Sequence, residues 1–283
     1  MGSEQDFHYP NLHNAAEAAA KPFEINRPDS MNLRITTIPL LVLGLIYPLL
    51  QSQAASPTES DESDLSRKVV DPTASLMTLG FKFSHVDGFH GRIDQSANQL
   101  QIQPVIPFEA FGVPNIMRIT ATHNLDGPKG SGFNDIAIFN LFVINEAWGR
   151  WGFGPVVDLI PDPLPGGDHL TAGPAIGAVL SQGQWTYGIF NQNFIGSSTE
   201  LSSIQPVIAY QLGNGYSLSA GEAQFTYDWR SGEWINLPAG VALNKVTAIK
   251  GQPIKLTINP EYNFSDFRGT SQFTLRLGLS LIF

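Results

Sequence analysis

The chain lacks cysteine altogether and carries few charged residues for its length. None of its 283 residues is Cys, which excludes a disulfide framework and a thiolate metal site. Charged residues make up 14% of the chain, against about 25% in an ordinary soluble domain. Lys and Arg number 16 against 25 Asp and Glu, for a formal net charge of -9. Because nucleic-acid phosphates are bound by clustered Lys and Arg, this balance argues against nucleic acid as a partner.

Catalytic and metal-binding motifs are missing as well. The six histidines are scattered without an HExxH pattern, and no Gly-x-Ser-x-Gly elbow occurs. The stretch NLDGPKGSGFND is acidic and Gly-rich but lacks the regular Asp spacing of a calcium loop, so we interpret it as a surface loop. We therefore expect no cofactor, no metal and no catalytic residue. An enzyme would have to pair one of several rim or loop histidines with a nearby serine: His85, His90, His123 or His169 with Ser84, Ser131 or Ser197.

The first long hydrophobic run has the pattern of a secretion signal. It begins at Met31 with basic Arg34, continues through an apolar core over 38–50 and reaches a small-residue site that predicts cleavage after Ala55. The core is too short for a membrane-spanning helix, which needs about 20 apolar residues.

These boundaries divide the chain into four parts. Residues 1–30 resemble no export element, so we expect them to lie outside the mature protein, with translation starting at Met31; an unusually long n-region is the alternative. Residues 31–55 form the signal peptide. Residues 56–75 form a polar, flexible periplasmic leader, in which we expect one helical turn near 64–69 that Pro72 ends. Residues 76–283 form the last part.

The region from 76 to 283 alternates between large apolar and small or polar residues, the period of strands with two unlike faces. About twelve such segments of about 10–12 residues follow one another, a length that suits a tilted strand crossing a bilayer. Two segments depart from the pattern. DIAIFNLFVIN, residues 135–145, is apolar on both faces, and YSLSAGEAQFTYDW changes phase after Gly221, which predicts a bulge at Gly221-Glu222.

Connections between the strands alternate in length. Short ones are expected near 110–112, 181–183, 213–215 and 250–251, and longer polar ones at 88–97, 124–132, 161–169, 195–200 and 265–270. Outer-membrane barrels have short periplasmic turns and longer external loops. The sequence therefore predicts an all-β protein, a transmembrane up-and-down antiparallel β-barrel of about twelve strands. A soluble lectin-like β-sandwich is the alternative fold.

The two faces of the predicted strands differ in a way that suits a membrane. The less apolar face carries mostly Gly, Ser, Thr, Gln and Asn with isolated charges, which fits a polar lumen better than a solvent-exposed surface. We expect six charged residues to face the lumen: Lys82, Arg118, Asp158, Glu222, Lys255 and Arg276. They either set selectivity for a small solute or pair with each other. Aromatic residues gather at strand ends, as at membrane interfaces: Trp148, Trp151, Trp185, Tyr187, Tyr216, Trp229, Trp234, Tyr262 and Phe283.

The last segment, QFTLRLGLSLIF, places a large apolar residue at every second position and ends on Phe. This pattern resembles the C-terminal signal that the insertion machinery of bacterial outer membranes reads. The residues of this predicted signal are Phe273, Leu275, Leu277, Leu279, Leu281 and Phe283. The expected partners are therefore outer-membrane lipid, the barrel-insertion machinery and a small-molecule solute, in the outer membrane of a Gram-negative bacterium.

The chain resembles a family of bacterial outer-membrane barrels that are often labelled "transporter" or "neuromedin U" and that are similar to barrels labelled "MetA-pathway of phenol degradation". The likeness is carried in order by DLSRKVVDPTASL, IQPVIPF, GFNDIAIF, WGFGPVVDLIP, IQPVIAYQLGNGYSL and KGQPIKLTINPEYN, and by the closing strand. It covers most of the region after the signal but not residues 1–30. The resemblance implies a barrel, with a helical leader over 64–75 that plugs the lumen, and it implies no defined substrate.

Together these patterns predict a passive channel or transporter for small solutes, hydrophobic or aromatic ones among them. A non-conducting structural or surface-interaction barrel is the main alternative, and an outer-membrane lipid-modifying enzyme is a second one. The sequence leaves open the solute, the openness of the lumen and the oligomeric state.

Overall fold

The computed structural model describes residues 65–128, 130–161, 163 and 166–283. The predicted upstream segment, the signal peptide and the first part of the leader, up to residue 64, lie outside the described residues. Within the described part of the chain, no helix is long and apolar enough to cross a membrane.

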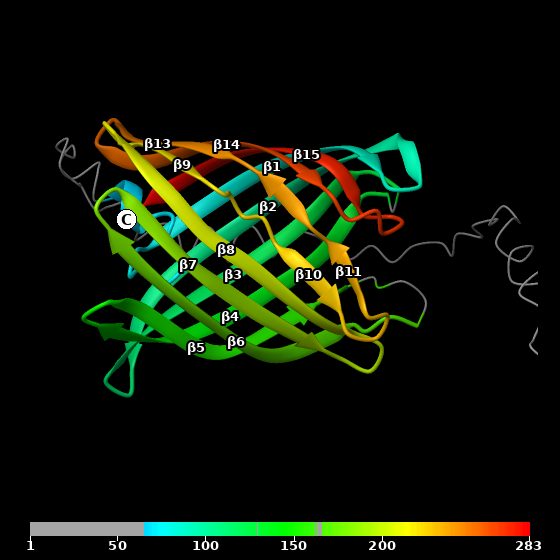
Figure 1. Ribbon diagram of the computed structural model, residues 1–283, viewed down its shortest axis with the longest axis horizontal. Coiled ribbons are helices and arrows are strands. Elements are labelled where there is room, and N and C mark those ends of the chain that lie inside the picture. The colour runs from blue at the N-terminus through cyan, green and yellow to red at the C-terminus, as the bar shows by residue number, and fades with distance from the viewer. Residues whose placement is uncertain (1–64, 129, 162, 164–165) are drawn as a thin grey trace, which may run out of the picture. The chain divides into compact units, whose positions relative to one another are not determined.

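Fifteen strand segments make up almost the whole described chain (Figure 1). In order they are β1 (Thr78–Phe89), β2 (Arg92–Ala110), β3 (Val113–Asp126), β4 (Gly132–Glu146), β5 (Gly149–Leu159), β6 (Leu170–Gln182), β7 (Trp185–Ile195), β8 (Glu200–Gly213), β9 (Tyr216–Ser219), β10 (Phe225–Asp228), β11 (Glu233–Asn236), β12 (Pro238–Gly240), β13 (Ala242–Ile249), β14 (Gln252–Asn263) and β15 (Ser271–Ile282). All pairings between them are antiparallel.

The segments form one closed barrel. β1 pairs with β15, with Thr78 opposite Ile282, and β8 pairs with β9, so the sheet returns on itself. β9 and β10 follow one line along the wall and β11, β12 and β13 follow another, so the fifteen segments make twelve wall strands. The predicted all-β, twelve-stranded up-and-down barrel is confirmed, and the β-sandwich alternative is wrong. Closure pairs the long strands on both sides, which is what a lipid environment demands of a β-structure. Among the described segments, β11 pairs only with β10, and residues 220–224 leave the sheet.

The two ends of the barrel differ as expected. One end, here called the turn end, holds Leu65, Phe283 and tight turns in which Phe111, Asn214 and Lys250 have φ of 56°, 50° and 51°. Each of the three is followed by a glycine that also has positive φ, the requirement of a two-residue hairpin turn matched to strand twist. The opposite, loop end carries the longer connections. One predicted loop is wrong: residues 88–97 form a tight hairpin, because β1 runs on to Phe89 and β2 starts at Arg92.

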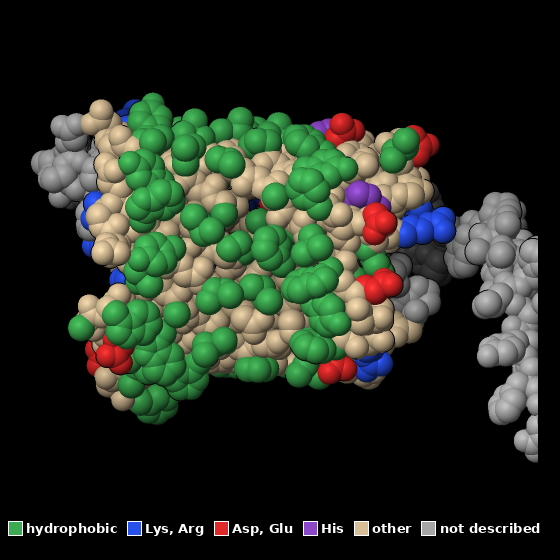
Figure 2. Space-filling model, viewed as in Figure 1, with side chains coloured by type: hydrophobic (Ala, Val, Ile, Leu, Met, Phe, Trp, Pro, Cys, Tyr) green, Lys and Arg blue, Asp and Glu red, His purple; other side chains and the backbone are tan. Residues whose placement is uncertain are grey.

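The outer face is an apolar band. Large hydrophobic side chains that are more than a third exposed occur on all sides of the barrel, among them Ile176, Ile189, Ile208, Leu256 and Leu277. Figure 2 shows hydrophobic side chains across the middle of the barrel and charged ones gathered at its two ends. Exposed aromatic rings flank the band, with Trp148, Trp185 and Tyr216 at the turn end and Trp229, Trp234 and Tyr262 at the loop end. Rings at these two levels suit the interfaces of a bilayer.

The lumen is not polar throughout, and this corrects the expectation for the inner face. On β3 to β7 the inward residues form a packed apolar cluster: Ile116, Phe139, Leu141, Val143, Val156, Ala175 and Phe190. Rings of Phe139 and Phe190 lie 5.0 Å apart between centroids. The inward faces of β5 to β7 are rich in Gly, so the two rings have room to fold inward over the wall. This cluster explains why residues 135–145 are apolar on both faces: one face meets lipid and the other fills half of the barrel interior.

At the loop end, one carboxylate ties two connections together. Asp168, which precedes β6, accepts hydrogen bonds of 2.9 Å from the backbone amides of Ser197 and Ser198, and both serine hydroxyls donate to it as well. The Ser197 hydroxyl is the strongest of the influences that hold the pKa of Asp168 well below its usual value, against burial, which raises it. Arg230 reinforces the junction by donating to the Ser197 carbonyl at 2.6 Å.

Candidate functional site: a charged ring in the lumen

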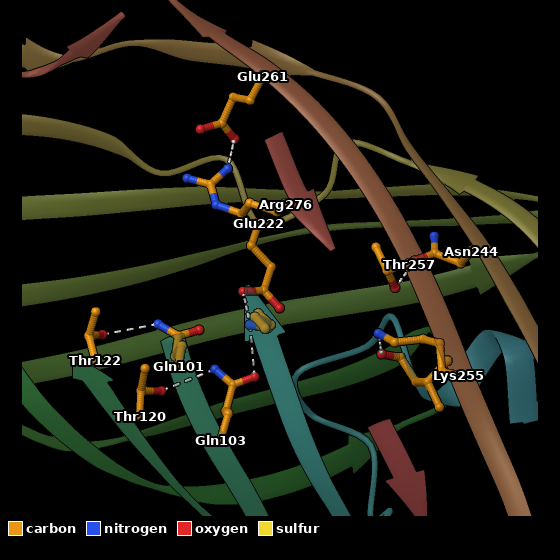
Figure 3. Close-up of polar contacts among 12 residues, drawn as sticks. Gln101, Gln103, Thr120, Thr122, Glu222, Asn244, Lys255, Thr257, Glu261 and Arg276 are labelled. Atoms are coloured by element: carbon orange, nitrogen blue, oxygen red, sulfur yellow. Dashed lines mark hydrogen bonds and ion pairs between the residues drawn. The ribbon is translucent and has the colours of Figure 1, made fainter. Parts of the chain in front are cut away.

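A break in the barrel wall positions one acidic residue of the site. β9 ends at Ser219 and β10 begins at Phe225, so residues 220–224 leave the sheet between them. Gly221 has φ +67°, and a Cβ atom there would lie 2.2 Å from the Asn259 side-chain oxygen, so the chain passes β14 at a distance that only glycine permits. The predicted bulge at Gly221-Glu222 is thus a longer interruption. It turns Glu222 into the lumen (Figure 3).

Four wall elements join Glu222 in a ring of charges. Lys82 of β1 forms an ion pair with Glu222 and donates a second hydrogen bond to Gln103 Oε1 at 3.1 Å. Arg276 of β15 forms an ion pair with Glu261 of β14, with 2.7 Å between Nη1 and Oε2. Arg118 of β3 and Lys255 of β14 lie within electrostatic range of Glu222. We call these six residues the lumen ring: Lys82, Arg118, Glu222, Lys255, Glu261 and Arg276.

Arg118 and Lys255 differ from the other two cations of the ring. Within the described part of the chain, neither forms an ion pair with a carboxylate. The Arg118 guanidinium carbon lies 4.3 Å from the centroid of the Phe139 ring, and the buried Nε atom has no hydrogen-bond partner. Lys255 Nζ donates one hydrogen bond, of 3.3 Å, to the carbonyl of Val69. Both are therefore held by neutral groups and keep donors for a further partner.

Uncharged residues complete the polar side of the lumen. Three hydrogen bonds join side chains of β2 and β3 beside the ring: Gln99 to Asn124, Gln101 to Thr122 and Gln103 to Thr120, at 3.0, 3.3 and 3.0 Å. Figure 3 shows the second and the third. Across the barrel, the Thr257 hydroxyl donates to Asn244 Oδ1 at 2.9 Å. Because each amide is held by a neighbour, these walls are polar but well ordered.

The segment before β1 closes the turn end of the lumen. Residues 65–68 form a helical turn, and Ser66, Thr73 and Ala74 have at most 3% of their surface exposed. Asp71 anchors the segment: it accepts bonds from the Thr73 amide and hydroxyl at 2.7 and 2.6 Å and forms an ion pair with Arg150 of β5. We call residues 65–76 the plug segment.

Two cavities lie in the lumen on either side of the ring. The first, of about 140 Å³, is lined by the plug segment and by ring residues such as Lys82, Arg118 and Lys255. The second, of about 280 Å³, extends toward the loop end. Gln103, Arg118 and Glu222 line both, so the two cavities meet beside the ring. Of the described residues, no group of His, Cys, Asp and Glu is arranged to hold a metal ion.

The structure places five of the six lumen candidates together and one apart. Lys82, Arg118, Glu222, Lys255 and Arg276 meet in the ring, whereas Asp158 lines the second cavity with Asp135 as its acidic neighbour. Sequence reasoning missed Glu261, although it continues the inward phase of Lys255 and Asn259 and alternation alone places it there. It also missed the anchor between Asp71 and Arg150, for which the sequence contains no signal, because 79 residues separate the two.

Residues of the predicted insertion signal lie on the outer face of the barrel, as the sequence predicts. Phe273, Leu277 and Leu279 of β15 are between 36% and 45% exposed on the outer face. The Phe283 amide donates to the Met77 carbonyl at 3.0 Å, which fastens the last residue to the start of β1.

Of the four histidines that an enzyme could use, His85 and His90 are hydrogen-bonded to other groups, whereas the buried Nδ1 of His123 has no hydrogen-bond partner. His85 Nδ1 lies 2.9 Å from Asn98 Oδ1, and the Asn98 amide donates to Asp126 Oδ2 at 2.9 Å, which makes a polar chain on the rim of the loop end. Ser84 points to the opposite face of its strand from His85, and the Ser197 hydroxyl is used by Asp168. None of the hydrogen bonds between described residues joins a histidine ring to a serine hydroxyl.

A closed twelve-stranded antiparallel barrel, with an apolar outer band between aromatic levels and charges inside, has the fold of an outer-membrane β-barrel. Among solved structures, NanC porin is similar over 72% of this chain and 98% of its own, with a TM-score of 0.52 and 10% identity. An outer-membrane channel from Pseudomonas putida F1 matches 82% of this chain and 98% of its own, with a TM-score of 0.47 and 13% identity.

The Escherichia coli outer membrane phospholipase A matches 72% of this chain and 95% of its own, with a TM-score of 0.42 and 15% identity. At these identities the likeness shows the fold alone. No family model matches the chain, and no curated protein matches its sequence.

Proposed function

We propose that this protein is a passive channel of the Gram-negative outer membrane for small solutes, and that it belongs to the barrel family labelled "transporter" or "neuromedin U" which its sequence motifs resemble. The observation that carries the channel proposal is the pair of lumen cavities that meet at a ring of charges. A purely structural barrel of this size has no need for buried cations that lack carboxylate partners, because such groups are costly to desolvate.

An opening beside the wall break supports solutes with hydrophobic character. Ile208, whose side chain points outward from β8 and is 48% exposed, nevertheless lines the first cavity. Gly221 and Ala242, on the two sides of the break, line it too. Figure 2 shows a small hollow in the wall close to the break that follows β9. The cavity therefore meets the apolar outer surface as well as the lumen, and an apolar solute can approach it without crossing the whole polar interior.

The test is conductance of the purified full chain in a planar bilayer, with the barrel first verified by a mobility shift between heated and unheated gel samples. Discrete conductance steps are expected, together with passage of small solutes in liposome swelling. A folded barrel that produces neither would overturn the channel proposal in favour of the structural or surface-interaction barrel.

A lipid-modifying enzyme is the second candidate. The observation that favours it is the row of hydrogen-bonded side chains at the rim next to lipid, formed by His85, Asn98 and Asp126. Hydrolysis of phospholipid that disappears on His85→Ala, with the barrel still folded, would establish it.

A further inference from the structure

The lumen ring carries an excess of positive charge although the whole chain is acidic. Its four cations face two carboxylates, and the two ion pairs use Glu222 and Glu261 for Lys82 and Arg276. Arg118 and Lys255 are left over. Asp71, a further carboxylate on the wall of the first cavity, is taken up by Arg150. In a protein with a net charge of -9, this local reversal of sign marks a place where an anion is stabilised.

Arg118 and Lys255, the two cations without a carboxylate partner, both offer hydrogen-bond donors that a carboxylate can accept. The Arg118 guanidinium carbon lies 4.3 Å from the Phe139 ring centroid and 5.7 Å from that of Phe190, so both rings pack near it while its Nε stays without a partner. A guanidinium held in this way matches the two oxygens of a carboxylate. Lys255 makes one bond, to Val69, and an ammonium group has three donors. Because burial weakens screening by water, a carboxylate between these two side chains is favoured more strongly than at a surface.

The first cavity is small, and one part of its wall is apolar. That part includes Val105, Ile116, Phe139 and Val207 and reaches the outward side chain of Ile208, whereas Gln205, Asn244, Thr257 and other uncharged polar residues line the rest. The volume of the cavity is about 140 Å³, and a cavity of about 150 Å³ accommodates benzene. The size therefore suits one ring, which can lie on the apolar part of the wall while a single anionic group points at the lumen ring.

We infer that the first cavity is a binding site for amphipathic organic anions of single-ring size, with the carboxylate between Arg118 and Lys255 and the ring against Ile116, Phe139 and Val207. This inference rests on the proposed channel function and names the solute class for it. Glu222 sets the strength of the site, since it is the one carboxylate of the ring that lies close to both cations. Arg276 contributes less because Glu261 already neutralises it.

The experiment uses the full chain in detergent and in planar bilayers, with benzoate as the probe and benzyl alcohol and benzylammonium as neutral and cationic counterparts of the same shape. Benzoate is expected to bind by calorimetry and to reduce single-channel conductance from millimolar concentrations, and neither counterpart is expected to do so. In a KCl gradient the reversal potential should show preference for chloride.

Charge-neutralising variants separate this site from general effects. Arg118→Gln and Lys255→Gln should each weaken benzoate binding about tenfold, the loss expected for one charge-assisted hydrogen bond. Glu222→Gln should strengthen binding and anion preference. Lys250→Gln makes the same chemical change in a turn at the mouth of the barrel and should leave both unchanged.

The outcomes distinguish the two proposals. Conductance without anion preference and without benzoate binding would overturn the inference and keep the channel. Benzoate binding that depends on Arg118 in a barrel that never conducts would keep the site and overturn the channel. Equal binding of benzoate and benzyl alcohol would show that the cations play no part, and the inference would fall.

Discussion

Asp71 is a buried side chain that holds the plug segment, which has no backbone pairing with the sheet, against the barrel wall. The plug segment forms no strand, and its side-chain bonds to the wall include Arg150 to Asp71, Lys255 to the Val69 carbonyl and Gln211 to the Ser66 carbonyl. The first is charged on both sides, whereas the other two end on carbonyl oxygens. A hydrogen bond between charged groups contributes about 1.5–3 kcal/mol, so the bond to Asp71 is the strongest of these three.

Replacement of Asp71 should open the lumen at the turn end of the barrel. Asp71→Ala removes the acceptor for Arg150 and for both Thr73 donors, so we expect a plug segment that is cut faster by protease and a barrel with larger unitary conductance. Asp266→Ala, on an exposed loop at the other end, is the control and should change neither. Unchanged conductance with faster cleavage would mean that the plug segment does not limit the current.

Asp168 gives the loop end a predictable response to acid. The pKa of Asp168 is lower in the folded protein than in the unfolded chain. The ionised carboxylate therefore stabilises the folded protein fully at any pH above the ordinary carboxyl pKa of about 4. This stabilisation is lost only when the pH falls through the lower pKa of the folded protein. The amides of Ser197 and Ser198 should therefore stay protected from hydrogen exchange at pH 4. Asp168→Asn should expose them at neutral pH, whereas Asp266→Asn should not. Exchange that is already fast in the unmodified protein at pH 4 would contradict this assignment.

At the scale of the strand, the break at 220–224 depends on one glycine. Gly221→Ala adds a Cβ 2.2 Å from the Asn259 oxygen and also strains a positive φ. Gly112→Ala is the matched control, because its φ is +72° but nothing lies within 4 Å of the added atom. The control should lose about 1–2 kcal/mol from the backbone strain alone. Gly221→Ala should lose clearly more and should also change ion selectivity, since Glu222 moves with it; urea unfolding and reversal potentials measure the two effects. Equal losses would show that Asn259 moves aside.

Strand by strand, alternation in the sequence was sufficient for the fold and for most of the ring. Lys82, Lys255 and Arg276 lie on regular strands, so the period of two indicated their face directly. The same rule covers Glu261, which a stricter use of it would have included. The filled half of the lumen was not predictable in this way, because an inward Phe139 and an outward Phe142 look alike in a segment that is apolar on both faces. Pairs such as Asp71 with Arg150 depend on how the plug segment enters the barrel, and that is decided by packing, not by any local pattern.

At the scale of the whole molecule, the final residue has a place both in the closure of the barrel and in the predicted signal for its insertion into the membrane. Phe283 is bonded to Met77 next to the seam between β1 and β15, and it ends the predicted insertion signal. Phe283→Ala should reduce the fraction of chain that reaches the membrane as a heat-modifiable barrel to a minor one. Phe153→Ala removes an exposed ring of the same kind from the outer face of β5 and should leave that fraction nearly unchanged. Full assembly of the Phe283 variant, judged by gel mobility in membrane fractions, would show that the terminal ring is dispensable.

The interruption between β9 and β10 has a consequence for how such a barrel can diversify. Glu222 belongs to no strand, so an exchange at this position alters the charge of the lumen ring without removing a backbone hydrogen bond of the barrel wall. Position 222 thus separates the charge of the lumen from the pairing that closes the barrel. A single codon can change how strongly the lumen prefers anions while the architecture stays the same.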